Sequence, residues 1–97
     1  MNIASILENQ KIEKRIAITP EIAKKYISFG FDVSLSENYG SHLGFENEEY
    51  RELGVLILKD EKEIINNADI IVQVGLLSAD KSSLLKENQT FIGVLNP

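Results

Sequence analysis

The fold is decided by the stretch Asp69-Ile-Ile-Val-Gln-Val74, which is the clearest buried strand in this chain of 97 residues. A continuous apolar run of this length is typical of a strand in a parallel sheet, because both faces of such a sheet are covered. We therefore expect residues 70–74 to lie inside a parallel sheet.

The segments on either side of this strand predict the rest of the sheet. Further apolar segments lie at residues 3–7, 31–35, 55–58 and 90–95. Helical patterns alternate with them, starting at Thr19 and Asp60 and covering residues 47–53 and 78–85. This alternation predicts an α/β fold of three layers with a mostly parallel, five-stranded sheet. The expected strand order is flavodoxin-like or Rossmann-like, and we expect the fold to be incomplete at the carboxyl end of the chain.

Local signals mark the ends of the predicted helices. Thr19 suits the N-cap position and Pro20 suits the first helical position, where a missing N–H costs nothing. Gly30 is a natural stop for this helix. Asp60 can cap a later helix, with Glu63 placed three residues on as in a capping box.

The stretch Arg15-Ile-Ala-Ile-Thr-Pro20 is the strongest candidate for ligand recognition. It places a cation just before a new helix in an otherwise acidic chain. The guanidinium group matches the geometry of a carboxylate or phosphate, so Arg15 predicts a site for a small anion. The alternative is a surface arginine that precedes an ordinary capped helix.

Two more candidates follow strands in the predicted sheet. Ligands bind beyond the carboxyl ends of the strands in an open α/β sheet, and Gln73 and Asn96 come at two such ends. The ligand-pocket candidates are therefore Arg15, Gln73 and Asn96. For Gln73, a role in satisfying a buried neighbour is an equal alternative. For Asn96, which precedes Pro97, a turn is the favoured alternative.

Composition excludes several classes of function. The net charge of −5 argues against a nucleic-acid partner, and the absence of cysteine excludes disulfides and thiolate metal ligands. His42 is the only histidine, which is too few for a metal site, and it has no positioned partner for general-base catalysis. No Gly-rich phosphate loop occurs. We predict no catalytic residues, no metal ligands and no cofactor-binding residues within the chain.

One family has a similar series of motifs. Glu13-Lys-Arg-Ile-Ala-Ile-Thr-Pro20 resembles the opening motif of the alanine dehydrogenase/pyridine nucleotide transhydrogenase N-terminal domain. Further motifs of this family are resembled, in order, by residues 29–33, 37–45, 50–55, 68–74 and 85–95. The resemblance therefore covers nearly all of residues 1–97, which we assign to one domain of this type.

Departures from the motifs separate two branches of the family. The alanine dehydrogenases have Lys-Val-Lys-Glu-Pro after the fourth strand and a histidine that closes the fifth. Here the corresponding residues are Gln73-Val-Gly75-Leu-Leu and Asn96, and only Arg15 of the substrate-type residues remains. Because Asn96-Pro97 is similar to the end of that strand in the transhydrogenase alpha subunit, the chain resembles the N-terminal portion of this subunit.

The resemblance implies a function for a longer protein. In that family, hydride passes from NADH to NADP⁺ and is coupled to proton translocation. NAD(H) binds mainly on a following Rossmann domain, so we expect the chain to be a fragment that binds no cofactor tightly and has no activity alone. The implied partners are a second copy in a homodimer, the NADP-binding beta subunit and a membrane domain. The implied location is cytoplasmic, peripheral to the inner membrane.

Two alternatives remain open. The chain could be the N-terminal domain of an amino-acid dehydrogenase of the alanine or saccharopine type. It could also be a non-enzymatic module that binds a small anion at Arg15.

Overall fold

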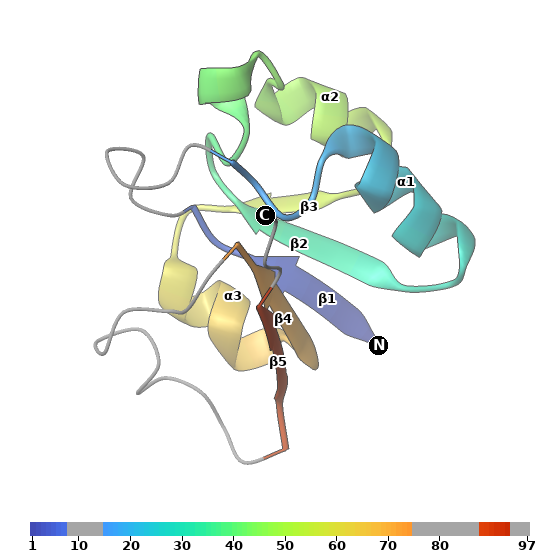
Figure 1. Cartoon of the computed structure of the whole chain (residues 1–97), viewed down its shortest axis with the longest axis vertical. Coiled ribbons are helices and arrows are strands. Elements are labelled where there is room, and N and C mark those ends of the chain that lie inside the picture. The colour runs from blue at the N-terminus through green and yellow to red at the C-terminus, as the bar shows by residue number, and fades with distance from the viewer. Residues whose placement is uncertain (8–14, 75–87, 94–97) are drawn as a thin grey trace.

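The computed structural model describes residues 1–7, 15–74 and 88–93 (Figure 1). The elements of these residues, in chain order, are β1 (Asn2–Ser5), α1 (Pro20–Ser28), β2 (Asp32–Ser36), the 3₁₀ helix η1 (Ser41–Leu43), α2 (Asn47–Glu52), β3 (Leu56–Leu58), α3 (Glu61–Asn67), β4 (Ile70–Gln73) and β5 (Thr90–Gly93). The helix predicted at residues 78–85 lies outside the described residues.

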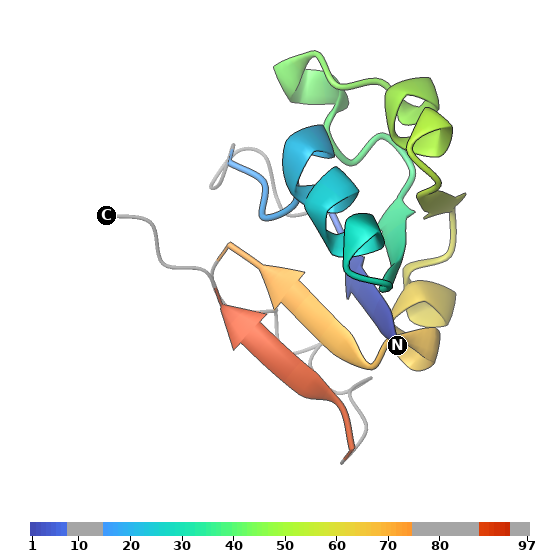
Figure 2. The same ribbon diagram turned by 90° about the vertical axis from the view of Figure 1, so that its right-hand side faces the viewer.

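The five described strands form one sheet in the order β3-β2-β1-β4-β5. Each neighbouring pair is parallel, and β4 and β5 run side by side at one end of the sheet (Figure 2). The prediction of a five-stranded, mostly parallel sheet is confirmed. Of the two orders considered, the observed one is Rossmann-like, because the chain first builds outward from β1 to β3 and then returns to add β4 on the other side of β1.

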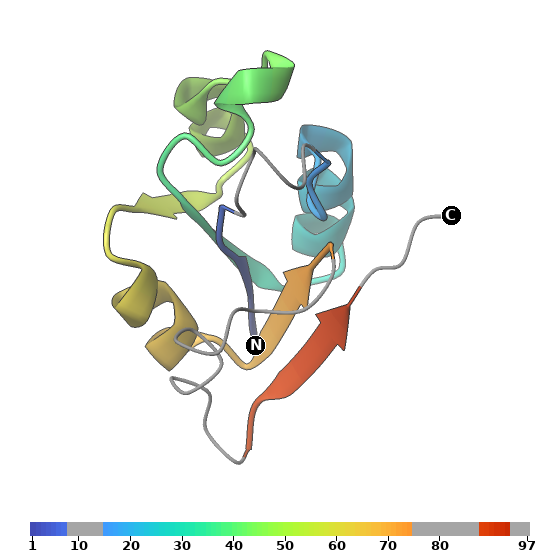
Figure 3. The same ribbon diagram turned by 60° about the vertical axis from the view of Figure 1, so that its left-hand side comes forward.

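Helices cover both faces of the sheet, as predicted. In Figure 3, α1 and α3 lie on opposite sides of the strands. One hydrophobic cluster joins α1 and α2 to one face, and its buried members are Ile3, Ala17, Ile18, Ala23, Val33, Leu35, Tyr39, Tyr50, Val55, Val72 and Val74. A second cluster joins α3 to the other face, and its buried members are Ala4, Ile6, Ile64, Ile65, Ala68 and Ile71. Alternating residues of β1 thus supply both layers of the core.

The signals for the helix ends are confirmed with one correction. Thr19 caps α1 by accepting a hydrogen bond from the N–H of Ile22, and Gly30 follows the helix with a φ of +94°. Asp60 caps α3, but its carboxylate accepts from the N–H of Lys62 and not from the N–H of Glu63. The reciprocal arrangement of a capping box is therefore not formed.

Two boundaries differ from the sequence prediction. The first strand ends at Ser5 and not at residue 7, because side chains and not a neighbouring strand take up the next backbone groups. The N–H of Ile6 donates to the Gln73 side chain, and the N–H of Leu7 donates to the Ser36 hydroxyl. Within the predicted loop at residues 38–44, the short helix η1 forms and ends at Gly44, whose φ is +87°.

Candidate functional site

The strands end together at one edge of the sheet, and the segment that carries Arg15 lies there. Ser5 and Gln73 are the last residues of β1 and β4, and their side chains are hydrogen-bonded at 2.8 Å. Since the chain of a parallel sheet reverses its direction of growth between these two strands, this is the position where a Rossmann-like sheet places a ligand. Arg15 itself is exposed to solvent.

Two buried tyrosines hold the segment that follows Arg15. The Tyr39 hydroxyl accepts hydrogen bonds from the N–H groups of Ala17 at 3.0 Å and Ile18 at 3.2 Å. The Tyr50 hydroxyl donates to the Ile18 carbonyl at 2.8 Å. The backbone between Arg15 and α1 is therefore hydrogen-bonded at donors and acceptor alike, which restricts where the arginine can lie.

Local sequence explains how the two tyrosines reach this segment. Tyr50 is the only apolar side chain of α2, so it carries the face of this helix that packs on the sheet. Tyr39 follows Asn38, which has a φ of +60° and whose N–H donates to the Asn47 side chain at 2.8 Å. This bond ties the turn after β2 to the first residue of α2. The two phenol rings then meet edge to face, with centroids 6.2 Å apart.

Gly40 provides the space for this approach. A Cβ atom at this position would lie 2.9 Å from the Cβ of Phe45 and 3.0 Å from the Tyr50 hydroxyl oxygen. Both distances are shorter than ordinary van der Waals contact. A glycine is therefore required here for the tyrosine to reach Ile18.

Burial shifts the acidity of one of these phenols. The Tyr50 side chain is fully buried, and desolvation of the charged form raises its pKa well above the ordinary value. The neighbouring Tyr39 and the Glu49 carboxylate raise the pKa further. Tyr50 therefore stays protonated over the physiological pH range and acts as a hydrogen-bond donor.

Gln73 is fully buried and its side chain is hydrogen-bonded to β1. Its Oε1 accepts from the Ser5 hydroxyl and from the N–H of Ile6, both at 2.8 Å, and its Nε2 donates to the Ile6 carbonyl at 3.0 Å. The structure thus shows the alternative in which Gln73 satisfies buried neighbours. Asn96 lies outside the described residues, and its ligand role stays a prediction, as does that of Arg15.

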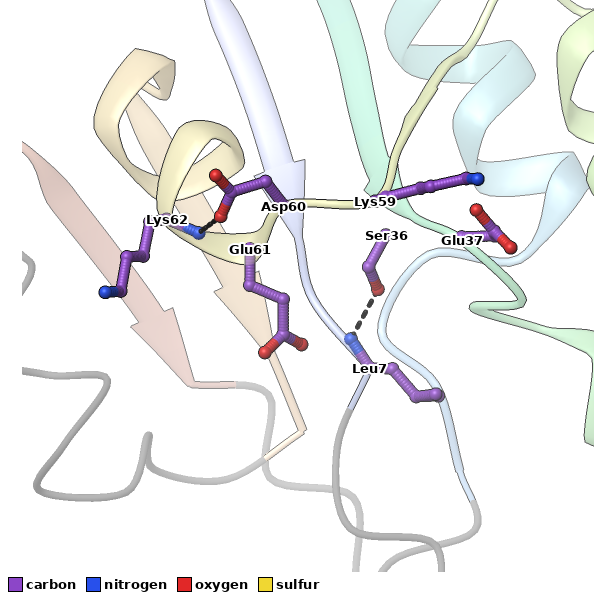
Figure 4. A pocket seen from close by; sticks show the side chains of 7 residues that line it. All are labelled: Leu7, Ser36, Glu37, Lys59, Asp60, Glu61 and Lys62. Carbon is purple, nitrogen blue, oxygen red and sulfur yellow. Dashed lines mark hydrogen bonds between the residues drawn. The ribbon is translucent and has the colours of Figure 1, made fainter.

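Figure 4 shows a hollow of about 350 Å³ that opens at the ends of β1, β2 and β3. It is lined by Leu7, Ser36, Glu37, Lys59, Asp60, Glu61 and Lys62. Acidic and basic side chains alternate around it, so it has no single sign of charge that would favour an anion. Neither Arg15 nor Gln73 lines this hollow, so it is separate from the predicted ligand pocket.

A dinucleotide does not fit the residues present. The connection from the first strand to the first helix, residues 6–19, contains no glycine, whereas a Rossmann phosphate turn needs several. Gln73, at the end of β4, is already occupied by β1. We therefore assign no step of a hydride transfer to the described residues.

Other expectations can be compared with the geometry. His42 lies half-buried in η1 and makes an interaction within the protein, so the expectation of a solvent-exposed histidine is not met in full. Among the described residues, no three of His, Asp and Glu are grouped to hold a metal ion. Within the same residues, no helix is long and apolar enough to cross a membrane.

Sequence reasoning missed the residues that organise the site, namely Ser5, Tyr39 and Tyr50. For Tyr50, a signal was present, because it is the single apolar residue of a charged helix. For Ser5 and Tyr39, no local pattern distinguishes a buried hydroxyl from an exposed one.

The fold and site define a class of protein, a Rossmann-like α/β domain with an arginine beside the carboxyl ends of its central strands. The model of the family "Alanine dehydrogenase/PNT, N-terminal domain" matches residues 6–97. The chain belongs to this family.

Two curated relatives come from different branches of the family. An NAD(P) transhydrogenase subunit alpha of Rickettsia prowazekii is 40% identical over the whole chain, which covers 26% of that protein. Alanine dehydrogenase 1 of Staphylococcus aureus strain N315 is 30% identical over 99% of the chain, which covers 25% of that protein. The chain therefore spans about a quarter of the length of these relatives.

Solved structures show the same fold. The transhydrogenase from Sinorhizobium meliloti matches 96% of the chain with a TM-score of 0.84 and 28% identity, and the match covers 28% of that chain. An L-alanine dehydrogenase matches 94% of the chain with a TM-score of 0.85 and 20% identity, over 25% of that chain. The second likeness is one of fold.

Proposed function

We propose that this chain forms the N-terminal portion of the alpha subunit of a proton-translocating NAD(P)⁺ transhydrogenase, in which hydride passes from NADH to NADP⁺. The observation that carries this proposal is the 40% identity to the Rickettsia transhydrogenase alpha subunit over the whole chain. The identity to the alanine dehydrogenase is lower, at 30%.

The other features of the proposed function belong to the longer protein. NAD(H) binds to a Rossmann domain beyond these residues, and the subunit forms a homodimer. It works with an NADP-binding beta subunit and a membrane domain, so that it is cytoplasmic and peripheral to the inner membrane. The chain supplies the covering domain with Arg15 at the edge of the cleft, and it performs no hydride transfer alone.

The second candidate is an amino-acid dehydrogenase of the alanine or saccharopine type. The observation that favours it is Arg15 itself, because a guanidinium group beside the strand ends suits the carboxylate of an amino or oxo acid. Against it stand Gly75 and Asn96, which occupy the positions of a lysine and a histidine in alanine dehydrogenases. A binding module for small anions stays a third possibility.

A pair of chimeras tests the choice. In one, residues 1–97 replace the matching quarter of the Rickettsia alpha subunit, and hydride transfer from NADH to NADP⁺ is measured together with the beta subunit and the membrane domain. In the other, they replace the matching quarter of the Staphylococcus alanine dehydrogenase, and NADH-dependent amination of pyruvate is measured. We expect activity in the first chimera alone. Activity in the second chimera alone would support the dehydrogenase.

A further inference from the structure

One buried network connects the end of β4 to the segment after Arg15. It runs from Gln73 to Ser5, from Ser5 to Tyr39, and from Tyr39 to the backbone of Ala17 and Ile18. We infer that Gln73 and Tyr39 are positioning residues, which determine where Arg15 lies by holding this backbone and do not contact a ligand themselves.

The direction of each hydrogen bond follows from the chemistry of the groups. The amide oxygen of Gln73 only accepts, so the single proton of the Ser5 hydroxyl must point to it. The proton between Ser5 and Tyr39 then has to come from the phenol, at an oxygen distance of 2.8 Å. With its proton used in this way, Tyr39 offers both lone pairs to the N–H groups of Ala17 and Ile18.

The orientation of the Gln73 amide is determined by its neighbour. The N–H of Ile6 can only donate and its carbonyl can only accept, so Oε1 and Nε2 are assigned without ambiguity. A change at Gln73 therefore alters the acceptor of Ser5, and through it the acceptor strength of Tyr39. The effect should reach Ala17 and Ile18, which Gln73 does not touch.

Burial makes the network sensitive to such changes. Ser5 and Gln73 are fully buried, and Tyr39 is 2% exposed, so water cannot replace a lost partner at low cost. The second tyrosine, Tyr50, holds the Ile18 carbonyl from the other side. Loss of Tyr39 thus leaves two buried N–H groups without an acceptor and frees the backbone beside Arg15.

The test is amide hydrogen exchange on the isolated chain, followed by NMR. The variants are Tyr39→Phe and Gln73→Met, and the matched control is Tyr26→Phe. Tyr26 packs edge to face against Phe31 at a centroid distance of 6.5 Å, away from the network. We expect exchange at Ala17 and Ile18 to rise about tenfold or more in both network variants, the effect of one weakened buried hydrogen bond. The control should leave it unchanged.

Three outcomes would overturn the inference. Exchange of Ala17 and Ile18 at the rate of an unstructured peptide in the unaltered chain is the first, and it needs no variant to fold. A folded Tyr39→Phe variant with unchanged exchange at both amides is the second. A folded Gln73→Met variant in which exchange changes only at Ile6 is the third.

A second measurement separates this inference from the proposed function, on which the ligand role of Arg15 rests. The same proteins are titrated with NADH, pyruvate and inorganic phosphate, with Arg15→Ala included. If a ligand binds through Arg15, we expect Tyr39→Phe to weaken it at least severalfold and Tyr26→Phe to leave it unchanged. If none binds, the ligand role of Arg15 fails, whereas the exchange rates still decide whether the network positions the segment.

Discussion

Gln73 illustrates how one side chain can suit two roles until its surroundings are known. A single amide at the end of an apolar strand fits a ligand contact as well as a structural hydrogen bond. The structure shows that all three of its hydrogen bonds go to Ser5 and Ile6 at the end of β1. These bonds join β1 and β4 just beyond their last paired residues, Ala4 and Ile71, so the amide extends the sheet where the backbone ladder stops.

At the same scale, Tyr50 predicts a pH dependence of stability. Its pKa in the folded protein is raised above the ordinary value of 10.0, so the folded state keeps a proton that the unfolded state loses. Stability from this group is fully present below that ordinary value and is lost as the pH rises above it. The expected slope approaches about 1.4 kcal/mol per pH unit.

The measurement is urea unfolding at pH values from 8 to about 11.5, a range that spans the ordinary tyrosine pKa. We expect Tyr50→Phe to lower stability at pH 8, because the Ile18 carbonyl loses its donor, and to flatten the decline above pH 10. Tyr26→Phe, which also removes one phenol, provides the control. Parallel declines in the unaltered chain and Tyr50→Phe would contradict the assignment.

At the scale of the element, the start of α1 combines a helix cap with the candidate site. Thr19 accepts from Ile22 at 3.3 Å, and the next two residues toward the N-terminus are those bound by the tyrosines. The helix thus begins at a point fixed from both sides. This explains why the motif from Arg15 to Pro20 contains a cation, apolar residues and a cap in such close succession.

The cap predicts a measurable loss of stability. Thr19→Ala removes the acceptor for the N–H of Ile22 and should lower the free energy of unfolding by about 1 kcal/mol. Thr19→Ser keeps a hydroxyl at the same place and should restore most of this loss. Thermal unfolding followed by circular dichroism measures both variants. Equal melting temperatures for Thr19→Ala and the unaltered chain would show that the cap contributes nothing.

At the scale of the whole molecule, β3 and β5 are the two edges of the described sheet. Each edge exposes a large apolar side chain, with Leu56 56% exposed on β3 and Ile92 45% exposed on β5. An exposed strand edge with apolar side chains is a site of association between chains. The isolated chain should therefore associate as its concentration rises.

Charged substitutions at these edges test this expectation. Ile92→Lys and Leu56→Lys, made separately, should each shift association to higher concentration, as followed by analytical ultracentrifugation. Phe29→Lys is the matched control, because Phe29 is 76% exposed but follows α1 and lies on no strand. If Phe29→Lys reduced association as much as the edge variants, the effect would be one of net charge.

The order of the elements could be predicted from the sequence because it depends on local patterns. Apolar runs such as residues 70–74 mark buried strands, and Thr19, Gly30 and Gly54 mark where helices begin or end. The motif at residues 15–20 and its successors along the chain also carried the family. These signals depend on neighbours within a few residues, which the sequence itself supplies.

Three other features were decided by the tertiary structure alone. They are the Rossmann-like strand order, the end of β1 at Ser5, and the network from Gln73 to Ile18. Each depends on groups that are far apart in the chain, such as Gln73 and Ile6, which are 67 residues apart. A hydroxyl or amide has the same local pattern whether it meets a ligand, water or a buried backbone group. Only packing, which removes water and leaves one partner within reach, distinguishes a ligand contact from a positioning residue behind Arg15.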